Sequence, residues 1–253
     1  MSHLLVRSRA CALFQDANQL CFGANEKVPL LSGDNFLTKI KVEPLRYSDL
    51  WRAADGRYRA FQSTPEQRYL ADRDYKRTRE LRDRVTSFFA FADAVRAKRA
   101  RAVGHGRASL HFYSRPGELP PKPRLAKLWR PIADALTSKE YKRRANELRD
   151  AVTMLQKEAI GDRAEKMFLV AGLATAPEWQ GHGYATALLE AVLEMADREG
   201  DAVWLATTDA AGFYERFEFE VVAETWVAKD NPDYHGPPVP IRMMIREAGR
   251  LAV

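Results

Sequence analysis

Residues Met167 to Gly200 read MFLVAGLATAPEWQGHGYATALLEAVLEMADREG, and this stretch decides the fold of the chain. Its first part, Met167–Ala174, is almost entirely apolar and predicts a strand buried on both faces. Pro177 ends that strand, because proline lacks the N–H that a sheet ladder needs. A helix follows, since apolar residues recur at helical spacing: Ala187, Leu188, Ala191, Val192 and Met195. Gly200 is placed to end this helix in a left-handed turn.

The loop between strand and helix, Gln180–Ala185, is a candidate phosphate-binding segment. The first turn of a helix presents unpaired N–H groups and the positive end of the helix dipole. Gly181 and Gly183 would let a phosphate approach the backbone closely. The two glycines alone do not distinguish a phosphate-binding loop from an ordinary strand–turn–helix, in which glycine serves only the turn.

The spacing inside the loop distinguishes three phosphate-binding motifs. A P-loop is excluded because no lysine follows Gly183. A dinucleotide-binding turn fits weakly, since Thr186 occupies its third small position and Asp201 precedes the next strand instead of ending it. The acyl-coenzyme A pattern Q/R-x-x-G-x-G/A is matched at every fixed place, by Gln180, Gly183 and Ala185.

On this loop the chain resembles the GCN5-related N-acetyltransferases, the GNAT superfamily. It is similar in style to the fungal branch and to puromycin N-acetyltransferases. Later stretches extend the resemblance to the family's fifth strand, its FY-containing helix and its last two strands: Ala202–Thr207, Ala211–Phe219, Val221–Ala228 and Val239–Arg246. The chain departs from the family at Glu218, where glycine is usual, and at Ala210 or Ala211, where many relatives carry asparagine.

The resemblance implies an α/β (α+β) GNAT fold, with a central mixed, mostly antiparallel sheet flanked by helices. We expect an N-terminal arm over residues 1–35 and a single acetyltransferase domain over 36–247. Within the domain, a helical insertion is expected at about 64–102 and 124–160, and the acetyl-CoA-binding core at 167–246.

Three local patterns add detail to this expectation. Phe36–Leu45 predicts a first strand ended by Pro44, and Asp49–Phe61 predicts a helix with Ser48 as its N-cap. Arg107–Ser114 alternates apolar and polar residues and predicts a half-buried strand, which the resemblance places beside the Met167 strand.

Composition narrows the class of protein and its partners. At 253 residues a single domain is expected, and the formal charge of +6 favours anionic partners. A polyanionic coenzyme would be such a partner. Nucleic acid is not favoured as a partner, because the basic run Arg96–Arg101 contains no aromatic residues that could stack on bases. Cys11 and Cys21 argue against a disulfide scaffold, and no apolar run is long enough to span a membrane, so we expect a cytoplasmic protein. The acid-poor start with Arg7 and Arg9 leaves a mitochondrial presequence open beside a floppy arm.

The resemblance also implies a reaction, the transfer of an acetyl group from acetyl-CoA to a primary amine of a small molecule. Tyr214 matches the family's general-acid tyrosine. The general base stays open among Glu165, His111 and a water chain, with Glu178 and Glu224 as further candidates. The expected cofactor-binding residues are Leu173, Ala174, Thr175, Gln180, Gly181, His182, Gly183, Tyr184 and Ala185.

Three further expectations concern metals, assembly and activity. The five scattered histidines form no metal-ligand spacing, so no metal is expected. The resemblance allows a monomer or a homodimer. Two alternative functions are a catalytically weak acyl-CoA-binding module and an acetyltransferase acting on protein or peptide amines.

Overall fold

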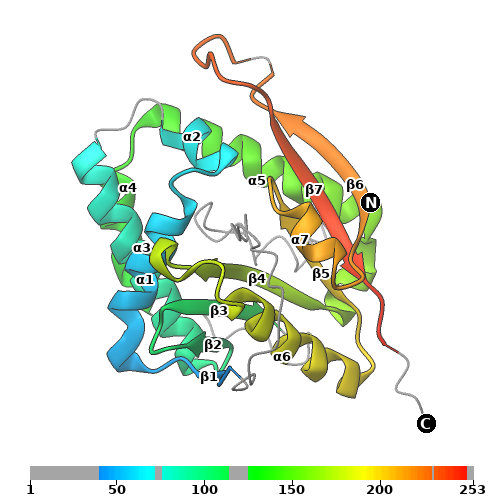
Figure 1. Cartoon of the computed structure of the whole chain (residues 1–253). Coiled ribbons are helices and arrows are strands. Elements are labelled where there is room, and N and C mark those ends of the chain that lie inside the picture. Colours follow the sequence, from blue (N-terminus) through cyan, green and yellow to red (C-terminus); the bar gives the residue numbers. More distant parts are fainter. Residues whose placement is uncertain (1–39, 72–75, 114–124, 230, 250–253) are drawn as a thin grey trace, which may run out of the picture.

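The computed structural model describes residues 40–71, 76–113, 125–229 and 231–249, which are built around a seven-stranded sheet (Figure 1). The strand order is β1-β2-β3-β4-β5-β7-β6, and neighbouring strands run antiparallel except for the parallel pair β4 and β5. The strands are β1 (Glu43–Pro44), β2 (Ala100–Val103), β3 (Ala108–Tyr113), β4 (Phe168–Thr175), β5 (Val203–Thr207), β6 (Glu220–Val227) and β7 (Val239–Arg246). The α-helices are α1 (Leu50–Phe61), α2 (Pro65–Ala71), α3 (Lys76–Arg96), α4 (Leu125–Ala135), α5 (Lys139–Ala159), α6 (Tyr184–Glu199) and α7 (Ala211–Glu215). The mixed, mostly antiparallel sheet predicted from sequence is confirmed.

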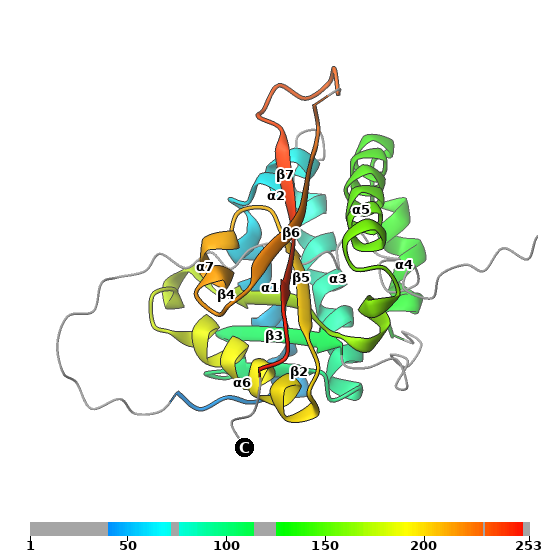
Figure 2. The same cartoon turned by 90° about the vertical axis from the view of Figure 1, so that its right-hand side faces the viewer.

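Helices cover both faces of the sheet, as the two views show (Figures 1 and 2). One face packs against α6 and α7 in a core that includes Leu188, Val192 and Phe213. The opposite face packs against α1, α2 and α5, through residues such as Phe61, Tyr69 and Leu148. The sheet therefore divides the core into an α6 side and an α5 side.

Strand β4 is buried along its whole length, as the apolar run predicts. In its pairing with β3, His111 lies opposite Gly172 and Phe112 lies opposite Val170, so Ala171 is an extra residue that forms a bulge. On its other edge β4 pairs with β5 only at Phe168 and Leu169. Beyond Leu169 the two strands separate, and a gap opens between their C-terminal ends.

Several boundaries differ from those expected. Residues 36–39 of the expected first strand lie outside the described residues, and within 40–45 the strand comprises Glu43–Pro44 alone. Asp49, not Ser48, is the N-cap residue of α1, with no side-chain cap. Residues 64–102 are not all helical, because Ala100–Val103 forms β2. The run of arginines hides this strand in the sequence, although Ala100, Ala102 and Val103 are buried.

Strand β3 is more buried than its alternating pattern predicts. Ser109 and His111, on the face predicted to be polar, are both buried. The reason is tertiary, since α1 and α3 pack on that face while α6 covers the other.

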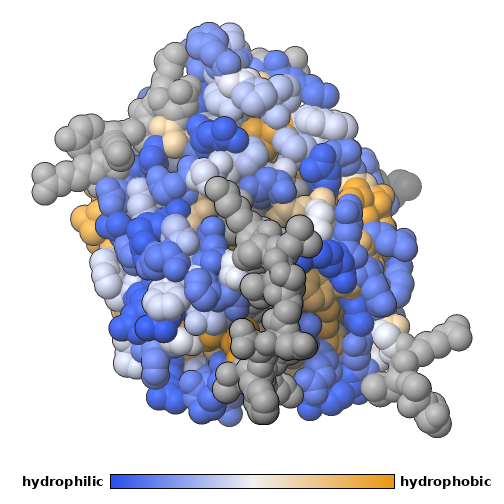
Figure 3. Space-filling model, in the orientation of Figure 1, coloured by the Kyte–Doolittle hydropathy of each residue, from blue (hydrophilic) through white to orange (hydrophobic). Residues whose placement is uncertain are grey.

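Helices α4 and α5 lie within the expected insertion at 124–160, and α5 packs on β6 and β7. Residues 1–35, with both cysteines, lie outside the described residues. None of the described helices combines the length and apolar character needed to cross a membrane. The face in Figure 3 is mostly hydrophilic, with hydrophobic surface gathered over α4 and over β6, where Leu128, Ile132, Val221 and Val222 are exposed.

The departure at Glu218 has a visible backbone consequence. Glu218 adopts φ of 64°, in the left-handed region that favours glycine. The turn between α7 and β6 therefore keeps the backbone shape that a glycine would adopt, in spite of the substitution.

Candidate active site

The loop Gln180–Ala185 holds the start of α6 in a conformation that two glycines make possible. Gly181 and Gly183 have φ of 78° and 74°, and Gly183 is the N-cap residue, with no side chain capping the helix. The Gln180 side-chain amide donates to the carbonyl of Thr175, 3.2 Å away, which ties the loop to the end of β4. The first N–H groups of α6 are thus left for an anion instead of a side-chain cap.

Aromatic and basic side chains make this loop rigid. Nδ1 of His182 lies 3.2 Å from the carbonyl oxygen of Trp179 and 3.0 Å from that of Gln180, so it carries the proton and donates it. The rings of Trp179 and Tyr184 stack with centroids 6.3 Å apart, and the Arg107 guanidinium lies 3.8 Å from the Trp179 ring. Trp179 is therefore held by its own neighbours.

An ion pair connects the loop to α1. Arg59 donates to both carboxylate oxygens of Glu178, at 2.7 and 2.8 Å, and to Asp55 at 2.8 Å. Its guanidinium lowers the pKa of Glu178. Glu178 therefore serves as an anchor just before the loop, and not as a base.

Tyr214 lies on the α6 side of the sheet, at the C-terminal end of β5. The amide of Ala210 donates to the hydroxyl oxygen of Thr207, 3.1 Å away, and this turn starts α7. The buried Tyr214 ring makes edge contacts with Phe213 and Phe219, with centroids 5.1 and 5.7 Å away. The position of its ring is therefore fixed by packing that a phenylalanine would also make.

Glu165 and Glu224 are not brought to the gap between β4 and β5. Glu165 is exposed in the segment before β4, whereas the expected cofactor residues Leu173–Thr175 lie at its other end, about 16 Å of strand from Phe168. Glu224 is paired with Arg242 across β6 and β7, at 2.8 Å.

His111 does reach the bulge, but in a state that does not suit a base. Burial, and then the charge of Arg57, lower its pKa to about 3, so the imidazole is neutral at physiological pH and accepts protons poorly. Its Nδ1 is buried with no hydrogen-bond partner among the described residues. A Cβ on Gly172 would lie 2.4 Å from His111 Cε1 and 2.5 Å from Arg57 Nη1, so glycine is needed there for both side chains to fit.

The structure reveals a carboxyl group that sequence reasoning missed. Glu66, in the first turn of α2, is 2% exposed, and the hydroxyls of Thr64 and Thr208 lie 2.7 and 2.5 Å from its oxygens. Burial raises its pKa to about 7, and the nearby Asp209 acts in the same direction. A buried carboxyl group that titrates near neutrality is a typical general base.

Glu66 and Tyr214 approach the same end of β5 from opposite sides. Thr208, which contacts Glu66, directly follows β5, and α2 packs on the α5 side through Tyr69 and Leu70. Tyr214 belongs to the core on the α6 side. A group bound beside this end of β5 would thus have a carboxyl group on one face of the sheet and a phenol on the other.

Comparison with known proteins bears on the fold and the class of the chain. Residues 149–221 match the family model described as "Acetyltransferase (GNAT) domain". This part of the chain is therefore similar to a GNAT acetyltransferase domain. This match supports an acyltransferase, while no curated protein matches the chain by sequence.

Solved structures of GNAT enzymes share the fold at low sequence identity. A mosquito arylalkylamine N-acetyltransferase like 5b has a TM-score of 0.53 at 14% identity, covering 82% of this chain and 99% of its own. Arylalkylamine N-acetyltransferase 2 from Aedes aegypti has a TM-score of 0.51 at 14% identity, covering 84% and 100%. An agmatine N-acetyltransferase has a TM-score of 0.50 at 13% identity, covering 83% and 99%. At these identities the likeness establishes the fold.

Proposed function

We propose that this GNAT protein transfers the acetyl group of acetyl-CoA to the primary amine of a small molecule by direct attack. The observation that carries the proposal is that a buried carboxyl group, Glu66, and a phenol, Tyr214, approach the C-terminal end of β5 from opposite faces of the sheet. The loop before α6, with free N–H groups and two left-handed glycines, supports a pyrophosphate as the anion.

We assign each step of the proposed reaction to a group of this chain. Beyond Leu169, the β5-facing edge of β4 pairs with no strand among the described residues, so its backbone can pair with the pantetheine amides. A backbone N–H near Leu173 would stabilise the oxyanion. The amine nitrogen bonds to the acetyl carbon as the C–S bond breaks; Glu66 accepts the amine proton and Tyr214 donates one to the leaving thiolate.

Burial of the base favours a small acceptor. Because Glu66 is only 2% exposed, an amine must enter the gap to reach it. An amine on a narrow molecule can do so more readily than one on a folded protein. A cytoplasmic location, a monomeric or homodimeric state and a fungal-type or puromycin-like specificity stay predictions.

The direct test is release of coenzyme A thiol from acetyl-CoA with a panel of small primary amines, alongside lysine-containing peptides. We expect amine-dependent release, with a stoichiometric acetylated product seen by mass spectrometry. Binding of acetyl-CoA without release by any amine would favour the catalytically weak module, and release with peptides alone would favour the protein acetyltransferase.

Replacing Gly183 by valine should weaken acetyl-CoA binding about tenfold or more, because a side chain there blocks the approach of phosphate to the backbone. Gly200→Val is a matched control, since Gly200 ends the same helix with φ of 70° and has open space for a Cβ. Both variants should lose similar stability from left-handed strain. Calorimetric titration with acetyl-CoA measures the difference, and equal affinities would remove the loop from cofactor binding.

Replacing Arg59 by methionine should raise the KM for acetyl-CoA without changing kcat. Both partners of the Arg59–Glu178 pair are partly exposed, so an effect of about fivefold or less is expected. Steady-state kinetics at varied acetyl-CoA checks this. Arg52→Met, on the exposed side of the same helix, is the control, and a fall in kcat alone would contradict the anchoring role of Arg59.

A further inference from the structure

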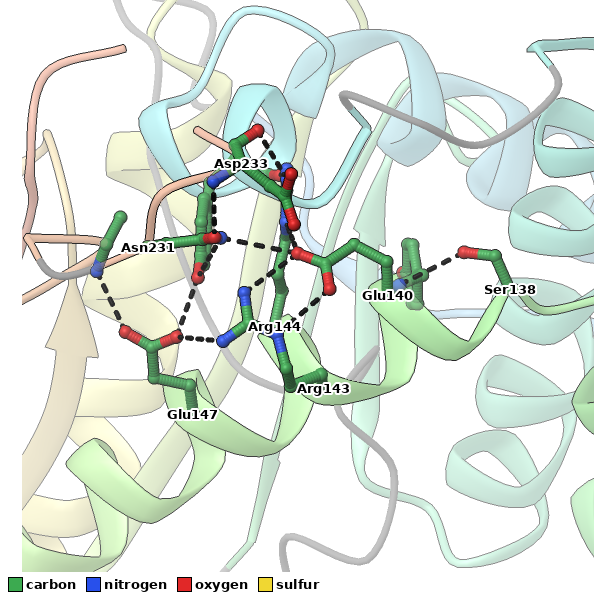
Figure 4. Close-up of polar contacts among 10 residues, drawn as sticks. Ser138, Glu140, Arg143, Arg144, Glu147, Asn231 and Asp233 are labelled. Carbon is green, nitrogen blue, oxygen red and sulfur yellow. Dashed lines mark hydrogen bonds and ion pairs between the residues drawn. The ribbon is translucent and has the colours of Figure 1, made fainter. Parts of the chain in front are cut away.

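Arg144, in the middle of α5, is fully buried although its guanidinium is always charged. It donates to the Glu140 carboxylate at 2.7 Å, to the Tyr69 carbonyl at 2.6 Å and to the Asp233 carbonyl at 3.2 Å (Figure 4). It also lies 4.9 and 5.6 Å from the ring centroids of Tyr69 and Tyr234. Burying a charge this completely has a desolvation cost, which the hydrogen bonds of the guanidinium must offset.

One set of contacts fastens α2. Tyr69 lies three residues after Glu66, one turn along a helix of only seven residues. Its carbonyl is among the last four of α2, which have no partner within the helix, and Arg144 supplies one. Its hydroxyl donates to Glu147 of α5 at 2.6 Å. Since so short a helix is marginal by itself, α5 holds it in place through both backbone and side chain.

A second set fastens the segment between β6 and β7. The amide of Ala228 donates to Glu147 at 2.9 Å. The side chain of Asn231 donates to the Tyr69 hydroxyl and to Glu140, each at 3.3 Å. Figure 4 shows Asn231 and Asp233 beside the α5 side chains of Glu140, Arg144 and Glu147. Helix α2, helix α5 and the residues Ala228, Asn231 and Asp233 thus share one polar cluster with Arg144 at its centre.

We propose that Arg144 is a positioning residue for acetyl transfer, which holds α2 so that Glu66 stays buried against Thr208. The inference rests on the proposed role of Glu66 as the base. Arg144 acts on Glu66 through Tyr69 and the rest of α2.

The charges around Glu66 show which readout separates positioning from simple stabilisation. Its neighbours are Thr64 on its own segment and Thr208 and Asp209 after β5, while Arg68 of α2 acts on Asp209. Burial is the largest cause of the raised pKa of Glu66. If α2 moves, water reaches the carboxyl group and its pKa falls toward the ordinary 4.5. A loss of stability alone would leave the pH profile of the remaining folded enzyme unchanged.

The experiment compares Arg144→Met with Arg143→Met in the full chain. Arg143 is the adjacent, exposed arginine that also pairs with Glu140, at 2.8 Å, so it controls for loss of a charge on that carboxylate. We expect Arg144→Met to lower the plateau kcat about tenfold or more, since small displacements of catalytic groups have large effects. We also expect the acidic limb of its pH–rate profile to move to lower pH by about one unit, while Arg143→Met changes neither.

A second Arg144 variant and a comparison with Glu66→Gln make the experiment decisive even if Arg144→Met does not fold. Arg144→Lys keeps the charge but loses the forked geometry, and should show the same shift in smaller measure if Arg144→Met does not fold. A wild-type pH profile and a kcat within twofold in the folded Arg144 variant would overturn the proposal. Glu66→Gln in the same assay separates the two failures. If Glu66→Gln is inactive while Arg144 variants are normal, only positioning is wrong; if Glu66→Gln is active, the role of Glu66 as base is wrong.

Discussion

Replacing Glu66 by glutamine is expected to lower kcat by about 10²- to 10⁴-fold, the range that a general base contributes. The amide keeps the size of the side chain and can still bond to the hydroxyls of Thr64 and Thr208, which lie 2.7 and 2.5 Å from the carboxyl oxygens. It cannot accept the proton of the attacking amine. Stopped assays of coenzyme A release, with acetyl-CoA and amine both saturating, measure the loss.

The pH dependence of wild-type enzyme and variant should differ in a defined direction. Glu66 acts as a base only when ionised, and its pKa is about 7, so wild-type kcat should rise with pH through about 7. The folded-state pKa is higher than the unfolded value near 4.5. Its contribution to stability is therefore full below about 4.5 and is lost as pH rises through about 7. Glu66→Gln should lack both the rise in rate and this fall in the free energy of unfolding.

Two other glutamates serve as controls for the Glu66→Gln test. Glu165→Gln changes an exposed carboxylate before β4, and Glu158→Gln changes an exposed one on α5. Both should keep kcat within twofold of the wild type. A normal rate in Glu66→Gln combined with a large loss in Glu165→Gln would return the role of base to the residue suggested by sequence.

The segment from β4 to the end of α6 could be predicted from sequence because its signals are local. The apolar run of β4, the breaker Pro177 and the helical spacing up to Gly200 each specify structure within a few neighbouring residues. Gly183 and Gly200 are indeed in left-handed conformations at the two ends of α6. The later strands and the mixed, mostly antiparallel sheet were predicted from the resemblance to the GNAT superfamily, because local patterns do not contain them.

Features that depend on distant contacts could not be predicted in the same way. Glu66 follows Pro65 in a Thr-Pro-Glu sequence that is typical of a helix start, where an exposed acid is expected. In the fold it is buried and accepts a hydrogen bond from Thr208, 142 residues away along the chain. Strand β2 and the buried face of β3 likewise depend on α1 and α3, which pack over them. The roles of Tyr214 and of the cofactor loop stay predictions, for which the structure gives the positions of the residues.

Replacing Tyr214 by phenylalanine is expected to lower kcat about 10²-fold while leaving the KM for acetyl-CoA nearly unchanged. A phenol, with an ordinary pKa of about 10, can donate a proton to a departing thiolate, and a phenyl ring cannot. The edge contacts with Phe213 and Phe219 would be kept, so the variant should fold with nearly wild-type stability. Tyr47→Phe removes a hydroxyl from an exposed ring and should change neither constant.

The two losses should also respond differently to the chemistry of the acceptor. An amine of lower pKa is already neutral at pH 7 and needs less help from a base, so it should restore part of the rate in Glu66→Gln. It should restore none in Tyr214→Phe, because the leaving thiolate is the same for every amine. Rescue of both variants by the same weakly basic amine would contradict this division of the two proton transfers. Glu66 and Tyr214 would then not act as separate base and acid on opposite sides of the β4–β5 gap.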